Sequence, residues 1–363
     1  MKAYVLNGIG QLDYMEVKKP ELKSGWVLVE VGAAGICESD IPRIFKTGTY
    51  HFPTIPGHEF AGKVVEVFDK EAEYWLGKRV GVFPLIPCKE CFVCKDEKYE
   101  MCRNYDYMGS RRDGGFAEYV AVPVWNLIEL PDAMPMDAAA MLEPASVARH
   151  AVKRLEITPE DTVALFGLGT IGIIITQWLH ILGVKKVYAI GHHPEHGEAM
   201  KQTASTEYEY FNDVKKAADE GKHKMQQSAE AWLMERTGGK GVTIAIDCVG
   251  SSSVLTTCLN CVRPGGQVLT VGNPRGDVAL EKAVYWKILR NQIRLTGTWN
   301  SSFTHDTEDD WNQVMKAVCD GTLKLSELIT HRLGFDELEK GLLIARDRLE
   351  YRNKIMIFHP EIK

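Results

Sequence analysis

Four cysteines crowd into fifteen residues of this 363-residue chain and form the spacing C-x2-C-x2-C-x7-C. They are Cys88, Cys91, Cys94 and Cys102. Four thiolates so close together can surround one Zn²⁺ and leave no position for substrate or water. Such a site stabilises the structure of a loop and does not catalyse a reaction. The alternative is two disulfides in a secreted protein. The chain is long, however, and its cysteines are spaced like zinc ligands, so we predict a structural zinc site.

A second group of metal-binding residue types is spread over three separate turns. Cys37 lies in G-I-C-E-S-D, His58 and Glu59 lie in P-G-H-E-F, and Glu143 lies in L-E-P. Each residue alone is a weak signal, because a lone buried cysteine usually packs in a core. Together, a thiolate, an imidazole and a carboxylate could hold a zinc ion with one position open. An open zinc site polarises a carbonyl oxygen or lowers the pKa of a bound alcohol or water.

A glycine-rich turn, G-L-G-T-I-G, follows an apolar run at 162–166 and precedes a helical pattern. Its candidate cofactor-binding residues are Gly167, Gly169, Thr170, Ile171 and Gly172. The first glycine allows a tight turn, the second lets the backbone approach a pyrophosphate, and the third permits close packing of helix on strand. Glycines also make ordinary turns, but the strand–turn–helix context predicts dinucleotide binding at the helix N-terminus.

The residue type that grips the ribose 2′-hydroxyl of NAD is missing from its usual place. An Asp or Glu is expected about 20 residues after the glycine turn, but Gly191 stands there. His192, His193 or Lys201 could pair with a 2′-phosphate instead. The cofactor is therefore NAD or NADP, with a lean toward NADP, unless the histidines merely cap a surface loop.

The elements that must position these residues change in character near residue 155. Before it, strand-like segments such as 27–31 and 62–67 are broken by Gly and Pro, which predicts an antiparallel, barrel-like domain. After it, apolar strands alternate with helical stretches, which predicts a parallel sheet covered on both faces. The expected strands are 162–166, 186–190, 242–247, 267–271 and 293–297.

The tail from about residue 300 carries two helical stretches and a final strand at 354–358, and we expect it to return to the first domain. The expected domains are therefore 1–152 with 300–363, and 153–299. The polar segment 213–235 is expected to be a solvated helix without function.

Composition excludes several classes of protein. Hydrophobic residues make up 45% and charged residues 25%, so a large core is available. The net charge of −6 argues against a nucleic-acid partner. No apolar run reaches the ~20 residues that span a bilayer, and no export signal is visible, so we expect a cytoplasmic protein without membrane association.

Taken together, these motifs give the chain a family resemblance. It resembles the zinc-dependent medium-chain alcohol and polyol dehydrogenases over its whole length, in G-H-E-F-A-G at 57–62, the cysteine ladder, D-G-G-F-A-E-Y at 113–119, L-E-P at 142–144 and the glycine turn. The resemblance implies an α/β fold: a GroES-like, β-rich catalytic domain plus a Rossmann domain, with the active site between them. It also implies two zinc ions per chain and an NAD(P)-linked oxidoreductase.

Roles follow from the matching motifs. Cys37 and His58 match zinc ligands, and Glu59 matches a carboxylate that exchanges with water at the metal. Glu143 matches a position that is a carboxylate in polyol dehydrogenases and a cysteine in many alcohol dehydrogenases, which favours the polyol branch. Ser39 matches the hydroxyl that takes the substrate proton, and Asp40 the carboxylate that orients the histidine.

Two positions depart from the family pattern. Pro42 replaces a histidine that many relatives use in a proton relay, so any relay must run through other groups or water. Glu38 replaces a basic residue that in some relatives lies near the pyrophosphate, and we expect it to point away.

Basic and polar residues near the predicted site resemble those of polyol-phosphate members of the family. Arg43, Lys46, Arg111 and Arg112 could neutralise a phosphate, and Trp299 and Asn300 would contact substrate. The alternative for each cation is a surface ion pair. We expect a sugar-alcohol phosphate as substrate. The rivals are sorbitol, an arabitol phosphate or threonine as substrate, a zinc-free quinone or enone reductase, and a cofactor-binding protein without catalysis.

Relatives in the family are commonly homodimers or homotetramers that join their Rossmann sheets edge to edge. The strand near Ile293 is the expected edge.

Overall fold

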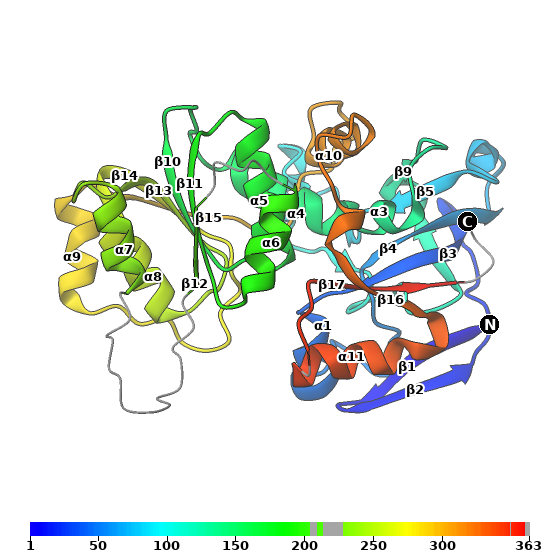
Figure 1. Ribbon diagram of the computed structural model, residues 1–363. Coiled ribbons are helices and arrows are strands. Elements are labelled where there is room, and N and C mark those ends of the chain that lie inside the picture. The colour runs from blue at the N-terminus through cyan, green and yellow to red at the C-terminus, as the bar shows by residue number, and fades with distance from the viewer. Residues whose placement is uncertain (204–208, 213–227, 349, 360–363) are drawn as a thin grey trace. The chain divides into compact units, whose positions relative to one another are not determined.

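The computed structural model describes residues 1–203, 209–212, 228–348 and 350–359 (Figure 1). Two compact units divide the chain: Met1–Ser146 with Ser301–Lys363, and Val147–Asn300. Most of the polar segment 213–235 lies outside the described residues, and only its end is seen, within helix α7 (Ala229–Arg236). Among the described residues, none of the helices combines the length and apolar character needed to cross a bilayer.

The first unit is built on a seven-stranded sheet. Its strands run β16-β17-β3-β4-β5-β9, and β8 also pairs with β3. All neighbours are antiparallel except β16 and β17, which are parallel, so the expected antiparallel domain has one exception. These strands are β3 (Trp26–Ile36), β4 (Glu59–Val67), β5 (Arg79–Val82), β8 (Tyr119–Pro123), β9 (Leu127–Glu129), β16 (Ile329–Gly334) and β17 (Lys354–Phe358).

Two small sheets complete the strands of this unit. They are β1 (Lys2–Gly8) with β2 (Gln11–Glu16), and β6 (Leu85–Ile86) with β7 (Asp106–Tyr107). Its helical elements are α1 (Asp40–Pro42), η1 (Arg43–Thr47), η2 (Lys70–Trp75), α2 (Phe92–Lys95), η3 (Tyr99–Met101), η4 (Val124–Asn126), α3 (Met136–Ala140), α10 (Asp310–Cys319), η5 (Ser326–Leu328), η6 (Phe335–Glu337) and α11 (Leu338–Asp347).

The core of the first unit lies between the large sheet, the β1–β2 hairpin and helix α11. Val27, Val29 and Val31 alternate along β3 and are fully buried, as the two-residue period of a strand requires. The last strand, β17, pairs with the end of β3. The chain thus returns to its starting sheet after more than 300 residues and places a C-terminal strand beside the turn that carries Cys37.

The second unit is a six-stranded parallel sheet in the order β12-β11-β10-β13-β14-β15. Helix α4 (Leu142–Lys153) leads into it. Its strands are β10 (Thr162–Phe166), β11 (Lys186–Gly191), β12 (Glu209–Asn212), β13 (Val242–Asp247), β14 (Val262–Thr270) and β15 (Arg294–Gly297). Numbered within the unit, this is the order 3-2-1-4-5-6 of a doubly wound dinucleotide-binding sheet. The expected parallel sheet is confirmed.

Helices cover both faces of that sheet (Figure 1). One face carries α5 (Thr170–Ile181) and α6 (Pro194–Thr203), and the other carries α7, α8 (Ser252–Cys261) and α9 (Lys282–Arg290). The strands between them are almost wholly apolar, and Ala164, Ile244 and Val268 are fully buried. A parallel sheet with both faces covered produces this unbroken apolar pattern.

Candidate functional site

Three residues with metal-binding side chains converge where β3 ends and β4 begins. Cys37 follows β3, His58 precedes β4, and Glu59 is its first residue. One ligand atom from each lies within 4.8 Å of the other two. The antiparallel register pairs Gly35 with Glu59, and a Cβ at Gly35 would overlap the Glu59 carboxylate. Sulfur, imidazole nitrogen and carboxylate oxygen form a donor set that suits zinc. We call these three residues the donor cluster.

Asp40 supports the donor cluster from α1. Its carboxylate accepts a hydrogen bond from the backbone N–H of Cys37 at 3.0 Å and lies 3.3 Å from Nδ1 of His58. Arg43 donates to the same carboxylate at 2.8 Å. Burial alone would raise the pKa of Asp40, but His58 and Arg43 outweigh it and lower that pKa. An ionised Asp40 can therefore fix the orientation of the His58 ring. Arg43 is bound to the same carboxylate and is part of this arrangement.

Ser39 lies beside the sulfur of the donor cluster. Its hydroxyl donates to Sγ of Cys37 at 3.3 Å. A hydroxyl at this place could hydrogen-bond to a substrate oxygen that is bound beside Cys37. The structure thus brings Ser39, Asp40 and the donor cluster together.

Glu143 lies near the donor cluster but outside the group of mutually close ligand atoms. It is buried at the start of α4 and accepts a hydrogen bond from the hydroxyl of Tyr107 at 3.3 Å. Burial raises the pKa of Glu143 to about 7, although His58 opposes that shift and Glu59 adds to it. The ring of Tyr107 also lies 5.9 Å from that of His58. Sequence analysis missed Tyr107.

A buried lysine is the second residue that sequence analysis missed. Lys354 opens β17, and its Nζ lies 2.5 Å from Oε2 of Glu59 and 3.3 Å from the carbonyl oxygen of Ile36. Burial lowers the pKa of Lys354, but the charges of Glu59, Cys37 and Glu143 together outweigh it and raise that pKa. The only sequence signal was a lysine at the edge of an apolar strand.

The four clustered cysteines form a separate site in the first unit. Their Sγ atoms lie 3.4 Å (Cys88–Cys102), 3.5 Å (Cys91–Cys94) and 4.0 Å (Cys88–Cys94 and Cys91–Cys102) apart. A Zn–S bond of ~2.3 Å places the sulfurs of a tetrahedron ~3.8 Å apart. A disulfide would require ~2.05 Å, and all nine cysteines are free. The spacing therefore fits one zinc ion and excludes the alternative of two disulfides.

The predicted basic residues do not form one cluster. Arg43 is held by Asp40, and Arg112 forms an ion pair with Asp106. Lys46 is exposed at the end of η1. Arg111 lies against the rings of Tyr50 and Tyr105, 4.0 Å and 4.6 Å from their centroids.

Three further residues considered in the sequence are also described by the structure. Glu38 forms an ion pair with Arg352. In the second unit, the side chain of Trp299 is 57% exposed, and Asn300 has a positive φ of 55°.

The glycine turn has the geometry that a dinucleotide requires. Gly167 follows β10 with φ of 95°, and a Cβ at Gly172 would overlap the carbonyl oxygen of Gly167. A Cβ at Gly169 would meet nothing within 4 Å, so the turn leaves open space beside its backbone. Thr170 and Ile171 form the first turn of α5. This open cradle at a helix N-terminus fits a pyrophosphate.

The loop after β13 supports the glycine turn. A Cβ at Gly167 would approach Val249 to 2.8 Å. Asp247 is buried at the end of β13, and its carboxylate accepts hydrogen bonds from the backbone N–H groups of Val249 and Gly250 at 2.8 and 2.9 Å. The carboxyl ends of β10 and β13 thus meet at the edge where doubly wound sheets bind ligands. The sequence D-C-V-G after a strand could have indicated this loop.

The residues that should select the cofactor lie at the end of β11. Gly191 is its last residue and is buried, and His192 and His193 are exposed. The side chain of Lys201 lies outside those described. No carboxylate occupies the position of Gly191.

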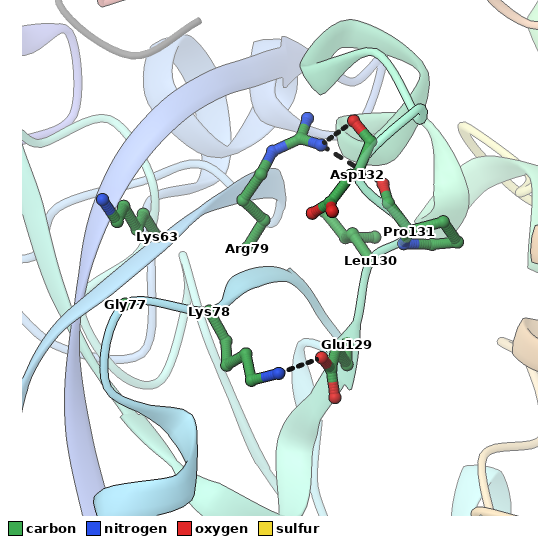
Figure 2. A pocket seen from close by; sticks show the side chains of 8 residues that line it. All are labelled: Lys63, Gly77, Lys78, Arg79, Glu129, Leu130, Pro131 and Asp132. Atoms are coloured by element: carbon green, nitrogen blue, oxygen red, sulfur yellow. Dashed lines mark hydrogen bonds and ion pairs between the residues drawn. The ribbon is translucent and has the colours of Figure 1, made fainter.

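A hollow of about 430 Å³ in the first unit holds none of the predicted site residues (Figure 2). Two of its charged groups form an ion pair, in which Nζ of Lys78 lies 2.7 Å from Glu129, and Arg79 donates to the backbone carbonyl oxygens of Pro131 and Asp132 (Figure 2). These contacts tie β5 to β9 and the loop after it. The hollow is a feature of the sheet edge, not of the candidate site.

Comparisons with known proteins agree with this geometry. Residues 23–132 match the alcohol dehydrogenase GroES-like domain, and residues 170–319 match the zinc-binding dehydrogenase family. The chain therefore belongs to the zinc-dependent medium-chain alcohol and polyol dehydrogenases. It combines a GroES-like domain with a Rossmann sheet, and it is an oxidoreductase of small molecules that uses zinc and a nicotinamide cofactor.

Individual relatives lie in the polyol branch. Galactitol 1-phosphate 5-dehydrogenase of Escherichia coli K12 is 31% identical over 96% of this chain and 98% of its own. Erythritol/L-threitol dehydrogenase of Mycolicibacterium smegmatis is also 31% identical, over 94% and 93%. The crystal structure of galactitol-1-phosphate dehydrogenase from Escherichia coli superposes with a TM-score of 0.85 at 29% identity, covering 99% of this chain and all of the other.

Proposed function

We propose that this enzyme oxidises a secondary hydroxyl of a sugar-alcohol phosphate to a ketone, with galactitol 1-phosphate giving tagatose 6-phosphate as the preferred reaction. The observation that carries the chemistry is the donor cluster, in which three ligand atoms of different chemistry lie within 4.8 Å of one another beside a serine hydroxyl. The relative that spans 96% of the chain and acts on galactitol 1-phosphate supports the choice of substrate.

Each residue of the site has a distinct task in this proposal. Cys37 and His58 would hold a zinc ion, Asp40 keeps the histidine ring oriented, and Glu59, which is paired with Lys354, would be a further ligand. Glu143 would complete the ligand set directly or through water. When bound, the zinc ion supplies Lewis acidity and the nicotinamide accepts the hydride.

Ser39 is the proposed first acceptor of the substrate proton. Its hydroxyl lies 3.3 Å from the Cys37 sulfur, so a substrate hydroxyl that shares this region can hydrogen-bond to it directly. Proton transfer by a positioned side chain contributes roughly 10²- to 10⁴-fold to the rate. Pro42 cannot relay the proton further, so the path outward runs through water or other groups.

We also propose the roles of the two units, the number of zinc ions and the choice of cofactor. The unit 1–146 with 301–363 would be the catalytic domain, and 147–300 would bind the cofactor. Two zinc ions per chain are proposed, one at the donor cluster and one at the cysteine ladder. NADP is favoured because no carboxylate opposes a 2′-phosphate at Gly191, and turnover with NAD that equals or exceeds turnover with NADP would reject this preference.

A substrate panel tests the proposal. Galactitol 1-phosphate, galactitol, erythritol, sorbitol, xylitol and threonine are compared by kcat/KM with both cofactors. The expected result is the highest kcat/KM for galactitol 1-phosphate. The erythritol/L-threitol dehydrogenase has the same 31% identity to this chain as the galactitol 1-phosphate enzyme, so an unphosphorylated polyol is the second candidate substrate. Faster turnover of any unphosphorylated compound would reject our first choice. Cys37→Ala should abolish turnover, and full activity in that variant would remove the donor cluster from the mechanism.

A further inference from the structure

Of the four cations expected to meet a phosphate, two are already paired with a carboxylate of the chain itself. Arg43 donates to Asp40, which is fully buried, and Arg112 is paired with Asp106. Arg111 differs, because its described neighbours are phenol rings and no carboxylate. Its Nε is buried and has no hydrogen-bond partner among the described residues. The Arg111 guanidinium carries five N–H donors in a fixed fork. Its charge has no carboxylate partner among the described residues, and its Nε–H has no acceptor.

Two tyrosines hold the plane of this guanidinium. Its central carbon lies 4.0 Å from the ring centroid of Tyr50 and 4.6 Å from that of Tyr105. Contacts with aromatic faces orient an arginine without cancelling its charge. Tyr50 is 67% exposed, so this aromatic clamp reaches the surface of the unit. The arrangement preorganises a cation for an anion that the protein itself does not supply.

The loop that carries Arg111 is tied to the donor cluster. The backbone N–H of Arg111 donates to the carbonyl oxygen of Tyr107 at 2.9 Å, and the Tyr107 ring lies 5.9 Å from that of His58. A Cβ at Gly109 would approach the carbonyl oxygen of Gly57, the residue before His58, to 2.6 Å. The loop is therefore pressed against the turn that carries His58, and Arg111 keeps a fixed position relative to the donor cluster.

We propose that Arg111, held between Tyr50 and Tyr105, is the residue that selects phosphorylated substrates by binding the phosphate monoester dianion through the edge of its guanidinium. The inference rests on the proposed function and names the residue that gives it specificity. Paired N–H groups on one edge of a guanidinium match two phosphate oxygens. Lys46 is exposed and supplies only a mobile point charge, so it is the rival that the test must separate.

The test compares the selectivity of variants for galactitol 1-phosphate over galactitol, measured as the ratio of the two kcat/KM values. Arg111→Gln should lower kcat/KM for galactitol 1-phosphate by about 10- to 100-fold, mainly through KM, as expected for lost hydrogen bonds to a charged group. Activity on galactitol should change by less than about threefold. Arg111→Lys should fall between the parent and Arg111→Gln. Arg112→Gln, the matched control one residue along, should keep the parent ratio.

The outcomes separate this inference from the proposed function. A parent enzyme that prefers galactitol overturns the proposed function and the role of Arg111 with it. A parent that prefers the phosphate, with an unchanged ratio in Arg111→Gln or a loss only in Lys46→Ala, overturns the role of Arg111 alone. Equal losses of kcat/KM on both substrates would mean that Arg111 only maintains the structure of the loop. That result would also overturn the proposed role of Arg111. If Arg111→Gln does not fold, inhibition by inorganic phosphate should weaken in Arg111→Lys and stay unchanged in Arg112→Gln.

Discussion

Lys354 and Glu59 form a buried ion pair at 2.5 Å between residues 295 positions apart in the chain, and their side chains are 4% and 1% exposed. The pair links β17, the last strand, to the first residue of β4. Glu59 is also a member of the donor cluster, so the pair ties β17 to the candidate metal site.

Removal of the lysine should therefore destabilise the first unit. Lys354→Met leaves the Glu59 carboxylate buried without its partner, and breaking one side of a buried ion pair costs about 3–5 kcal/mol. Denaturant titration followed by tryptophan fluorescence measures the loss. Lys354→Arg keeps the charge and should retain most of the stability. A Lys354→Met variant as stable as the parent would show that the pair contributes nothing net.

Replacement of the serine beside Cys37 should slow the reaction without removing the metal. Ser39→Ala deletes the proton acceptor, so kcat should fall by roughly 10²- to 10⁴-fold while KM changes far less. Zinc content, measured by mass spectrometry of the metal, should equal that of the parent. Ser39→Thr retains a hydroxyl and should recover much of the rate. An Ser39→Ala enzyme with the parent kcat would assign the proton transfer to another group.

Loss of one sulfur from the cysteine ladder should affect stability and not the chemical step. Cys91→Ser removes a zinc ligand, and the binding energy of a structural zinc is also folding energy. We expect zinc content to fall from two ions per chain toward one and Tm to fall by about 2–4 °C for each kcal/mol lost. Cys319→Ser alters an exposed thiol outside the ladder and is the control. Unchanged zinc content in Cys91→Ser would argue against a metal at the ladder.

Substitution in the glycine turn should weaken cofactor binding. In Gly172→Ala the new methyl group would overlap the carbonyl oxygen of Gly167, so the turn must open and its backbone amides move. We expect the Kd for the nicotinamide cofactor to rise at least about tenfold by calorimetric titration, since small displacements at such sites are costly. Gly276→Ala, in the same unit, adds a methyl group that meets nothing within 4 Å and should leave Kd unchanged. Equal Kd values in both variants would contradict the assignment.

Local patterns predicted most elements and motifs because their signals lie close together in the sequence. The strands 162–166, 242–247 and 354–358 have the predicted bounds, since short apolar runs between turns leave little choice. The four cysteines lie within fifteen residues, and the glycine turn within six, so their spacing and immediate sequence context indicate their chemistry. The glycine overlaps and sulfur distances are compatible with the ligands that we propose for these motifs.

Partners far apart in the chain could not be predicted. Nothing near Lys354 marks Glu59 as its partner, because the pair depends on β17 reaching the end of β3. The hydrogen bond from Tyr107 to Glu143 likewise depends on how two loops pack. Arg43 and Arg111 are both arginines with a lysine or arginine nearby in the sequence, yet one is paired with Asp40 and the other lies on tyrosine rings. A basic residue in a sequence indicates a possible binding site for phosphate. Only the packing shows which basic side chain lacks a carboxylate partner.

The edge strand β15 should join two copies of the chain. Its outer side pairs with none of the described strands, and Leu295 on β15 and Tyr285 and Leu289 on α9, which precedes it, are 42%, 53% and 59% exposed. An exposed edge with apolar neighbours is a template for pairing with another strand. We expect a homodimer, or a tetramer built from it, by light scattering after gel filtration. Leu295→Lys places a charge on this edge and should shift the mass toward the monomer, because a buried unpaired ammonium is costly. Phe68→Lys changes an apolar residue of the first unit that is 56% exposed, against 42% for Leu295, and should keep the parent mass. A Leu295→Lys variant with the parent mass would place the interface elsewhere.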